Sequence, residues 1–185
     1  MFHEISVAGE NESEDEQKKR IMDDFPGLTG NHGGSTERSG VMRNTLKVGD
    51  QFTFCYTVAG NKTVPNLYPE SAEYRAMPEV FATGFLVGLL EWCCIEALRP
   101  HLEDGEGSLG TYICTTHSAP TPPGMKVTVT ATCTDIKNGN NVFWDVEAHD
   151  ELELIAKGNH GRHVINSDRF SQHVAKKVAL AGRLS

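Results

Sequence analysis

Glu91 is a carboxylate in apolar surroundings, which makes it the first residue to consider for proton transfer. It stands in Leu89-Leu90-Glu91-Trp92-Cys93, the most apolar part of the 185-residue chain. Removal from water disfavours a carboxylate unless it is paired, and enzymes use such places to prepare a general base or an orienting acid. If Glu91 instead shares a solvated helix stripe with Glu96, its role is only structural.

His117 and Thr83 could complete a site for acid–base or nucleophilic chemistry. His117 ends the apolar run Cys114-Thr115-Thr116 beside a proline-rich turn, where a histidine is either a positioned acid or base or a plain surface residue. Thr83 and Gly84 begin another apolar run. The Thr83 hydroxyl there either caps a helix or attacks as a nucleophile once a base reaches it. Backbone N–H groups at a helix start stabilise an oxyanion, which suits acyl transfer.

The elements that must position these residues follow a simple order. Gln51 to Val58 alternates as a strand does, and apolar residues at a spacing of four predict a long helix from Thr83 to Leu98, ending before Pro100. An amphipathic helix capped by Ser167 closes the chain at about residue 180. Between the helices the sequence predicts four strands, with a hairpin turn at Asn138-Gly139-Asn140: Leu109–Ser118, Met125–Ile136, Val142–His149 and Leu154–Val164.

This order predicts an α+β fold of the hot-dog type over residues 45–185. A helix that is apolar on most of its faces must be covered on most of them. A curved antiparallel sheet wrapped round one long central helix provides that cover. Such sheets usually pair with a second copy, so we expect a homodimer.

Residues 1–44 differ from the rest of the chain and predict a disordered tail. Nine acidic and four basic residues fall within 1–40, and several glycines lie in the second half of that range. A formal charge of -8 and a pI near 5.4 argue against nucleic acid and anionic membranes as partners. No segment resembles a signal peptide or spans a bilayer, and we expect a cytoplasmic protein whose five cysteines are buried, reduced thiols.

Two further patterns are formal matches that we reject. Gly105-Glu106-Gly107-Ser108-Leu109-Gly110 fits GxGxxG but follows a helix and leads into a strand, which is the wrong context for a dinucleotide. His149, His160 and His163 lack the accompanying cysteine, histidine or carboxylate spacing of a metal site. We therefore expect neither a metal nor a cofactor.

A series of short motifs in fixed order closely resembles the fluoroacetyl-CoA thioesterase family, whose members are hot-dog dimers. The similarity runs from about Val48 to Phe170 and continues weakly after Gly124 through Trp144, Ala148-His149-Asp150, Gly158, His160 and Arg162. The motifs that carry it are Thr63-Val64, Leu67-Tyr68-Pro69-Glu70-Ser71, Pro78-Glu79-Val80-Phe81-Ala82-Thr83-Gly84-Phe85, Val87-Gly88-Leu89, Glu91-Trp92, Gly105-Glu106-Gly107-Ser108-Leu109-Gly110-Thr111, Thr116-His117 and Thr121-Pro122-Pro123-Gly124.

The resemblance implies that Thr83, Glu91 and His117 form the catalytic set of an acyl-CoA thioesterase. His117 would activate the attacking group, which is Thr83 or a water. Glu91 would orient His117 or act on the acyl intermediate. Gly110 would supply a backbone amide near the acyl group, and Arg162 would be the family's functional arginine. CoA would be part of the substrate rather than a cofactor.

The resemblance also points to substrate-binding residues around the helix start. Gly84 belongs there, and Tyr74 and Met77 occupy lid positions where members selective for fluoroacetyl groups carry two phenylalanines. The catalytic set is intact, so this departure concerns the acyl group rather than the chemistry. A short-chain acyl-CoA is therefore the expected substrate, without commitment to fluoroacetyl-CoA.

Helix geometry leaves open how Thr83 and Glu91 cooperate, because eight residues span roughly 12 Å along a straight helix. His117 bridges them, the helix unwinds at Gly84, or a partner subunit supplies one of them. Two other functions also fit a hot-dog domain: a non-catalytic module that binds acyl-CoA or another small molecule, and a dehydratase that uses a histidine and a carboxylate.

Overall fold

The computed structural model describes residues 42–182. Residues 1–41, which make up nearly all of the predicted tail, lie outside the described residues, and the prediction of disorder there stays a prediction. Met42 and Leu46 are both buried in the hydrophobic core. No described helix has the length and apolar character that crossing a membrane requires.

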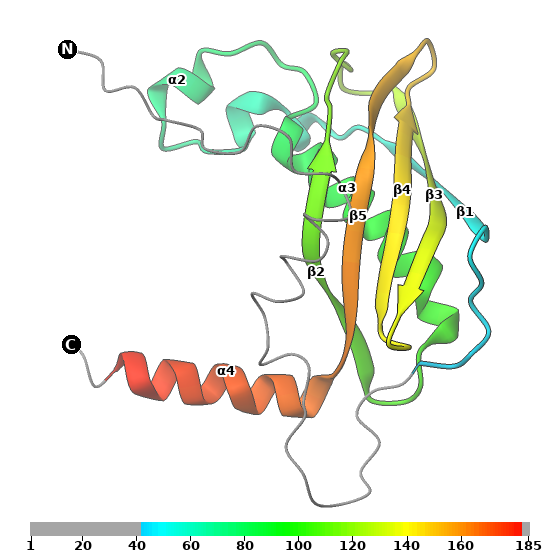
Figure 1. Cartoon of the computed structure of the whole chain (residues 1–185). Coiled ribbons are helices and arrows are strands. Elements are labelled where there is room, and N and C mark those ends of the chain that lie inside the picture. The colour runs from blue at the N-terminus through cyan, green and yellow to red at the C-terminus, as the bar shows by residue number, and fades with distance from the viewer. Residues whose placement is uncertain (1–41, 183–185) are drawn as a thin grey trace, which may run out of the picture. The chain divides into compact units, whose positions relative to one another are not determined.

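Five antiparallel strands form one sheet in the order β1-β3-β4-β5-β2, so that β1 and β2 are its edges (Figure 1). All five predicted strands are confirmed, with ends shifted by at most three residues. His117 lies two residues beyond the end of its strand. The bounds are β1 Gln51–Thr57, β2 Glu106–Thr115, β3 Lys126–Lys137, β4 Asn141–His149 and β5 Leu154–Asn166.

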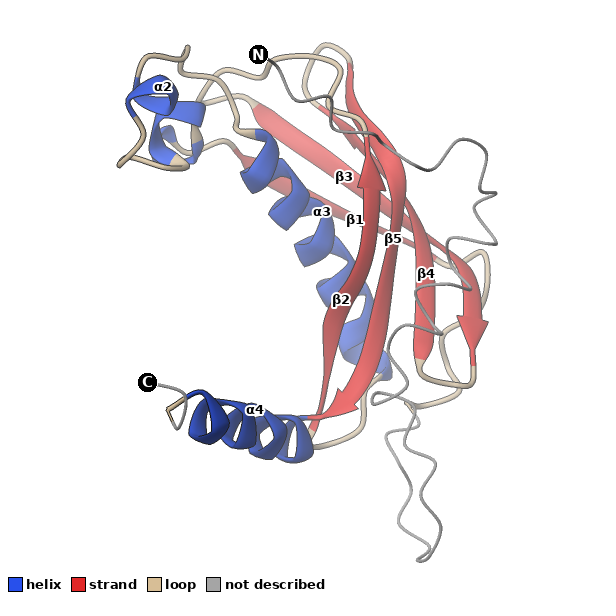
Figure 2. Ribbon diagram, turned by 60° about the vertical axis from the view of Figure 1, so that its left-hand side comes forward, coloured by secondary structure: helices blue, strands red, loops and turns tan. Residues whose placement is uncertain are grey.

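The helix α3, Thr83–Leu98, matches the predicted helix residue for residue and packs against the sheet (Figure 2). Leu86, Leu90 and Leu98 on this helix are fully buried, as are Val129 and Val146 on the strands. Alternate strand residues and one broad side of the helix thus form a single apolar core. The α+β arrangement predicted from the sequence is confirmed.

The start of α3 differs from the prediction that Thr83 caps the helix. The N-cap is Ala82, whose backbone is extended and whose side chain makes no capping hydrogen bond. Thr83 is the first helical residue, and its hydroxyl is therefore available to a partner outside the helix. The segment between β1 and α3 contains the 3-10 helices η1 Gly60–Lys62 and η2 Val64–Asn66 and the short helix α2 Ala72–Arg75.

A hairpin turn and a helix cap show how local chemistry determines the later part of the fold. Asn138 and Gly139 have φ angles of 54° and 71°, which are the two left-handed positions of a type I′ turn, and the Asn140 amide donates to the Lys137 carbonyl at 3.2 Å, so the predicted turn is confirmed. The predicted last helix is α4, Ser167–Ala181. Its N-cap is Asn166 rather than Ser167, because the Asn166 side chain accepts a hydrogen bond from the Arg169 amide at 3.0 Å.

All five cysteines are free thiols, but the prediction that all are buried is wrong for two of them. Cys55 and Cys114 are exposed, since they fall on outward-facing positions of the edge strands β1 and β2. Cys93 and Cys133 are buried, and burial raises the pKa of Cys93 to about 12 and that of Cys133 to about 11. These two thiols are therefore inert structural groups.

Gly158 is required by the close approach of β2 and β5. A Cβ atom there would overlap the Cys114 carbonyl oxygen and lie 2.6 Å from the Thr115 Cα, and neither backbone atom can move away cheaply. We expect Gly158→Ala to lower the free energy of unfolding by about 3 kcal/mol or more. Gly60→Ala, whose Cβ would meet nothing within 4 Å, is the control and should change it by less than about 0.5 kcal/mol. Equal denaturant midpoints for the two variants would contradict the crowding at Gly158.

Candidate active site

The three residues predicted to be catalytic belong to two polar pairs rather than one triad. The Thr83 Oγ1 lies 2.9 Å from the His117 Nδ1. The Glu91 Oε2 instead lies 3.4 Å from the Arg162 Nη1. Because α3 is regular from its first residue, unwinding at Gly84 is ruled out, and the two pairs are about 12 Å apart along the helix.

Backbone hydrogen bonds on both sides hold His117 opposite the start of α3. The Thr116 amide donates to the Lys157 carbonyl at 3.0 Å and the Ser118 amide to the Ile155 carbonyl at 2.8 Å, which extends the β2–β5 pairing past the histidine. The Phe81 amide donates to the Thr121 carbonyl at 2.8 Å. The segment before α3 is therefore tied to the segment after His117, and this brings the side chains of residues 34 positions apart into contact.

The half-buried His117 imidazole is set up to be neutral. Burial is the main cause that lowers the pKa of His117. A neutral imidazole has one N–H and one accepting nitrogen. When the Thr83 hydroxyl donates to Nδ1, the proton stays on Nε2, which is buried and has no hydrogen-bond partner among the described residues. His117 therefore does not bridge to Glu91 within the described chain.

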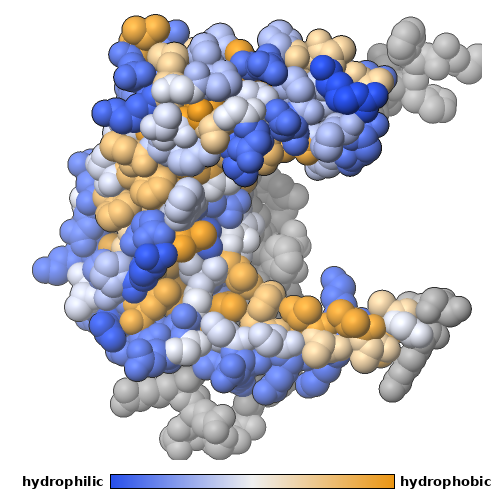
Figure 3. Space-filling model, turned by 180° about the vertical axis from the view of Figure 1, so that it is seen from behind, coloured by the Kyte–Doolittle hydropathy of each residue, from blue (hydrophilic) through white to orange (hydrophobic). Residues whose placement is uncertain are grey.

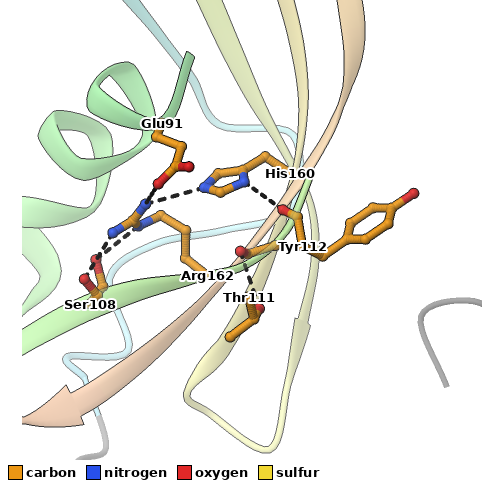
Figure 4. A network of polar contacts seen from close by, with 7 residues as sticks. Glu91, Ser108, Thr111, Tyr112, His160 and Arg162 are labelled. Atoms are coloured by element: carbon orange, nitrogen blue, oxygen red, sulfur yellow. Dashed lines mark hydrogen bonds and ion pairs between the residues drawn. The ribbon is translucent and has the colours of Figure 1, made fainter. Parts of the chain in front are cut away.

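The second pair belongs to a buried network centred on Arg162 of β5 (Figure 4). Its side chain is 3% exposed. The Arg162 Nε donates to the Ser108 Oγ at 2.9 Å, and Nη2 donates to the Ser108 carbonyl at 2.8 Å. Nη1 contacts both the His160 Nε2, at 3.2 Å, and the Glu91 Oε2. Each nitrogen of the guanidinium thus has an acceptor, which a buried cation needs.

His160 acts in this network as an acceptor, and its tautomer follows from its neighbours. Its Nδ1 lies 2.6 Å from the Tyr112 carbonyl, which can only accept, so Nδ1 carries the proton and Nε2 accepts from Arg162. Burial, followed by the charge of Arg162, lowers the pKa of His160 to about 4. From the sequence alone, His160 is rejected as a metal ligand and belongs to the weak part of the family resemblance, where no role is assigned to it. The usable signal is its spacing of two from Arg162, which places both on one face of β5.

Gly110 leaves the room that the Glu91 carboxylate occupies. A Cβ atom at Gly110 would lie 2.8 Å from the Glu91 Oε2 and 3.2 Å from the His160 Cε1. A register shift between Gly110 and Tyr112 interrupts the pairing of β2 with β5 at this point. Such bulges re-aim the backbone and are common beside active sites. Glu91 is 35% exposed and lies against the middle of an edge strand.

The lid segment, defined here as residues 67–80, lies over the start of α3. Leu67 packs on Gly84, where a Cβ would approach both Leu67 Cδ atoms to 3.1 Å. The Tyr74 ring packs edge-on against Tyr68, with centroids 5.4 Å apart, and Met77 is 53% exposed. The structure thus groups Gly84 with the Thr83–His117 pair and Gly110 with the Glu91–Arg162 pair, while Tyr74 and Met77 stand on the lid segment.

Comparison with known proteins gives one consistent family. Residues 63–168 match the model of a family described as fluoroacetyl-CoA-specific thioesterase. The fluoroacetyl-CoA thioesterase of Streptantibioticus cattleyicolor is 51% identical over 137 residues, which are 74% of this chain and 98% of that protein.

Solved structures agree with this family and with the fold. The fluoroacetyl-CoA thioesterase FlK superposes with a TM-score of 0.70 at 50% identity, covering 72% of this chain and 98% of that one. A thioesterase superfamily member from Thermus thermophilus superposes with a TM-score of 0.66 at 26% identity, covering 77% and 99% of the two chains. A variant of FlK has also been solved in complex with fluoroacetate and CoA. The predicted hot-dog fold is confirmed by these structures.

Because His160 is buried in its neutral form, it should make stability depend on pH. Its folded pKa of about 4 lies below the ordinary value of 6.5, so the unfolded chain binds the proton first as the pH falls. The contribution is complete above pH 6.5 and is lost toward pH 4, by about 3 kcal/mol. Glutamine keeps an acceptor for Arg162 and does not titrate. We therefore expect the free energy of unfolding of the wild type, measured with denaturant, to fall by that amount relative to His160→Gln between pH 7 and pH 4. Free energies that change in parallel with pH would contradict a neutral buried histidine.

Proposed function

The chain belongs to the fluoroacetyl-CoA-specific thioesterase family, and on this basis we propose that it hydrolyses a short-chain acyl-CoA thioester to the free acid and CoA. The observation that carries the proposal is the hydrogen bond between Thr83 and His117 at the start of α3. Nothing in the relatives favours a non-catalytic binding module or a dehydratase, since those described above are thioesterases or members of a thioesterase superfamily.

The start of α3 supplies what thioester cleavage needs. The first N–H groups of a helix have no acceptor within the helix, and they can stabilise the negative charge that the carbonyl oxygen of a thioester gains during attack. His117, neutral at pH 7, takes the proton of the attacking hydroxyl, which is that of Thr83 or of a water in its place. The carbon–sulfur bond then breaks, and the CoA sulfur receives the proton from His117. If Thr83 attacks, a water hydrolyses the acyl ester in a second cycle.

Glu91 is too far from His117 to orient the imidazole within one protomer. We therefore propose that Glu91 acts on the acyl group or on the acyl intermediate. Arg162 fixes the carboxylate from the buried side, and Gly110 leaves space for it at the edge of the sheet. We propose a homodimer in which two β2 strands pair, because β2 is one of the two open edges of the sheet and is the edge beside Glu91 and Gly110. Glu91, against the middle of β2, then lies at the junction between protomers.

We expect the lid segment, rather than the two polar pairs, to recognise the acyl group. Tyr74 brings a hydroxyl and Met77 a flexible thioether to this segment. The fluoroacetyl selectivity of the relatives therefore does not pass to this chain without a test. Five free cysteines support a cytoplasmic location, because disulfides form in oxidising compartments.

A panel of acyl-CoAs with two- to six-carbon chains, including fluoroacetyl-CoA, tests the proposed activity through detection of the released thiol. We expect turnover of at least one short chain, and a loss of about 100-fold or more in kcat for both Glu91→Gln and His117→Ala. His149→Ala, which removes an exposed histidine, is the matched control and should keep full activity. A folded wild-type protein without turnover above buffer for every substrate would refute the proposal.

The pH dependence of kcat/KM should report His117 as the base. Its pKa is lowered below the ordinary value of 6.5, and the neutral form is the active one, so activity should rise with pH through a limb that lies below pH 6.5. Measurements from pH 4.5 to 8 on wild type and His160→Gln separate this limb from the protonation of His160 near pH 4. A limb above pH 7 would show that another group is the base.

A further inference from the structure

The helix α4 carries an apolar face that the described chain leaves uncovered. It leaves the sheet at the N-terminal end of β2, where the Ser167 amide donates to the Gly105 carbonyl at 2.9 Å. Phe170, Val174 and Val178 are spaced by four, and the two valines are 43% and 66% exposed. The orange side chains of Figure 3 gather on the side of α4 that faces the open space. A 15-residue helix of this kind is marginal alone and needs packing on its apolar face.

The lid segment stands at the opposite end of the same strand. It leads into the start of α3 and thus lies near His117, which follows the C-terminal end of β2. Tyr68 and Met77 in this segment are each 53% exposed. Figures 1 and 2 show α4 and the region around α2 projecting beyond the β2 edge in the same direction, one from each end of the strand.

Pairing of two β2 strands across a two-fold axis brings these two features together. Antiparallel pairing sets the N-terminal end of one β2 beside the C-terminal end of the other. The α4 helix of one protomer then arrives at the lid segment of its partner. With 15 residues α4 is about 22 Å long, which exceeds four strand spacings of about 4.8 Å and is enough to reach across the partner's lid.

The charges of the two surfaces are complementary. The lid segment holds Glu70, Glu73 and Glu79 against Arg75 alone, which gives a net charge of -2. The helix α4 has the opposite balance of +2, with one acidic residue, Asp168, and three basic ones, Arg169, Lys176 and Lys177. Opposite net charges favour this pairing over the contact of a lid with a second lid, or of α4 with a second α4.

We propose that α4 of each protomer packs its apolar face on the lid segment of the partner and closes the acyl site there. Each active site is then completed by the other chain, with Tyr74 and Met77 held between the partner's α4 and the start of their own α3. The inference rests on the homodimer and the thioesterase activity of the proposed function, and it adds the element that sets the position of the lid.

The first test changes the apolar face alone. In Val174→Asp/Val178→Asp we expect faster hydrogen exchange in residues 67–80. We also expect KM to rise roughly tenfold, which corresponds to losing the burial free energy of about one valine side chain. Gln172→Asp/Ala179→Asp places the same two charges on the opposite face of α4 and is the control, with both readouts unchanged. Unchanged exchange of the lid in the valine double variant, with α4 still helical by circular dichroism, would overturn the proposal. Faster exchange in residues 1–41 instead of the lid would overturn it as well, because the chain's own N-terminal segment would then be the occupant.

The second test asks whether the contact is made between chains. A heterodimer of His117→Ala with Val174→Asp/Val178→Asp, purified through two different tags, has one working Thr83–His117 pair, and the intact α4 belongs to the other chain. We expect this heterodimer to recover the KM of the wild type. A KM that stays at the value of the double variant would show that α4 serves its own protomer and would overturn the proposal.

The wild-type controls separate this proposal from the function on which it rests. A monomer by light scattering that still hydrolyses acyl-CoA would overturn the α4 contact and leave the thioesterase function standing. A dimer whose lid exchange responds to the α4 variants but which hydrolyses no acyl-CoA would support the contact and refute the function.

Discussion

A guanidinium that is almost completely buried determines how the polar side of this molecule is built. Arg162 loses its hydration inside the sheet, and that cost is offset only if its N–H groups meet acceptors. Ser108 provides two of them, His160 a third and Glu91 a fourth. The requirement extends outward, because His160 must stay neutral to accept from Arg162. Gly110 must also lack a side chain for the Glu91 carboxylate to reach the arginine.

The straight course of α3 sets the second constraint. An unbroken helix keeps Thr83 and Glu91 about two turns apart, so the chain holds two separate polar centres on one helix. The centre at the helix start combines backbone N–H groups with a neutral histidine, which suits attack on a carbonyl. The centre farther along holds a carboxylate at fixed position beside an edge strand. A substrate that contacts both must therefore extend along α3, next to the edge where the second protomer of the proposed dimer would lie.

The sequence is sufficient for the elements but not for the contacts between them. The bounds of α3 follow from apolar residues at a spacing of four and from Pro100, and the hairpin at Asn138-Gly139 follows from the φ angles that this pair tolerates. These signals are local. The contact of Thr83 with His117 depends on hydrogen bonds across the sheet, and the role of His160 depends on a carbonyl 48 residues away, so neither is visible in a local pattern. The motif resemblance pointed to Thr83, Glu91, His117 and Arg162, but it did not divide them into two pairs.

The edge strand β2 connects all of these features, because each lies at a different height along it. Its N-terminal end adjoins α4, its middle lies against Glu91 through Gly110, and His117 follows its C-terminal end. In the proposed dimer, a two-fold axis between the two β2 strands places the N-terminal end of each β2 beside the C-terminal end of the other. The middle of each β2 strand then lies near the axis. The two Glu91–Arg162 centres of a dimer would thus be neighbours, while the two Thr83–His117 pairs would lie far apart, each beside the partner's α4. Changes at Gly110 would consequently act on both sites at once, whereas changes on α4 would act on the site of the other chain.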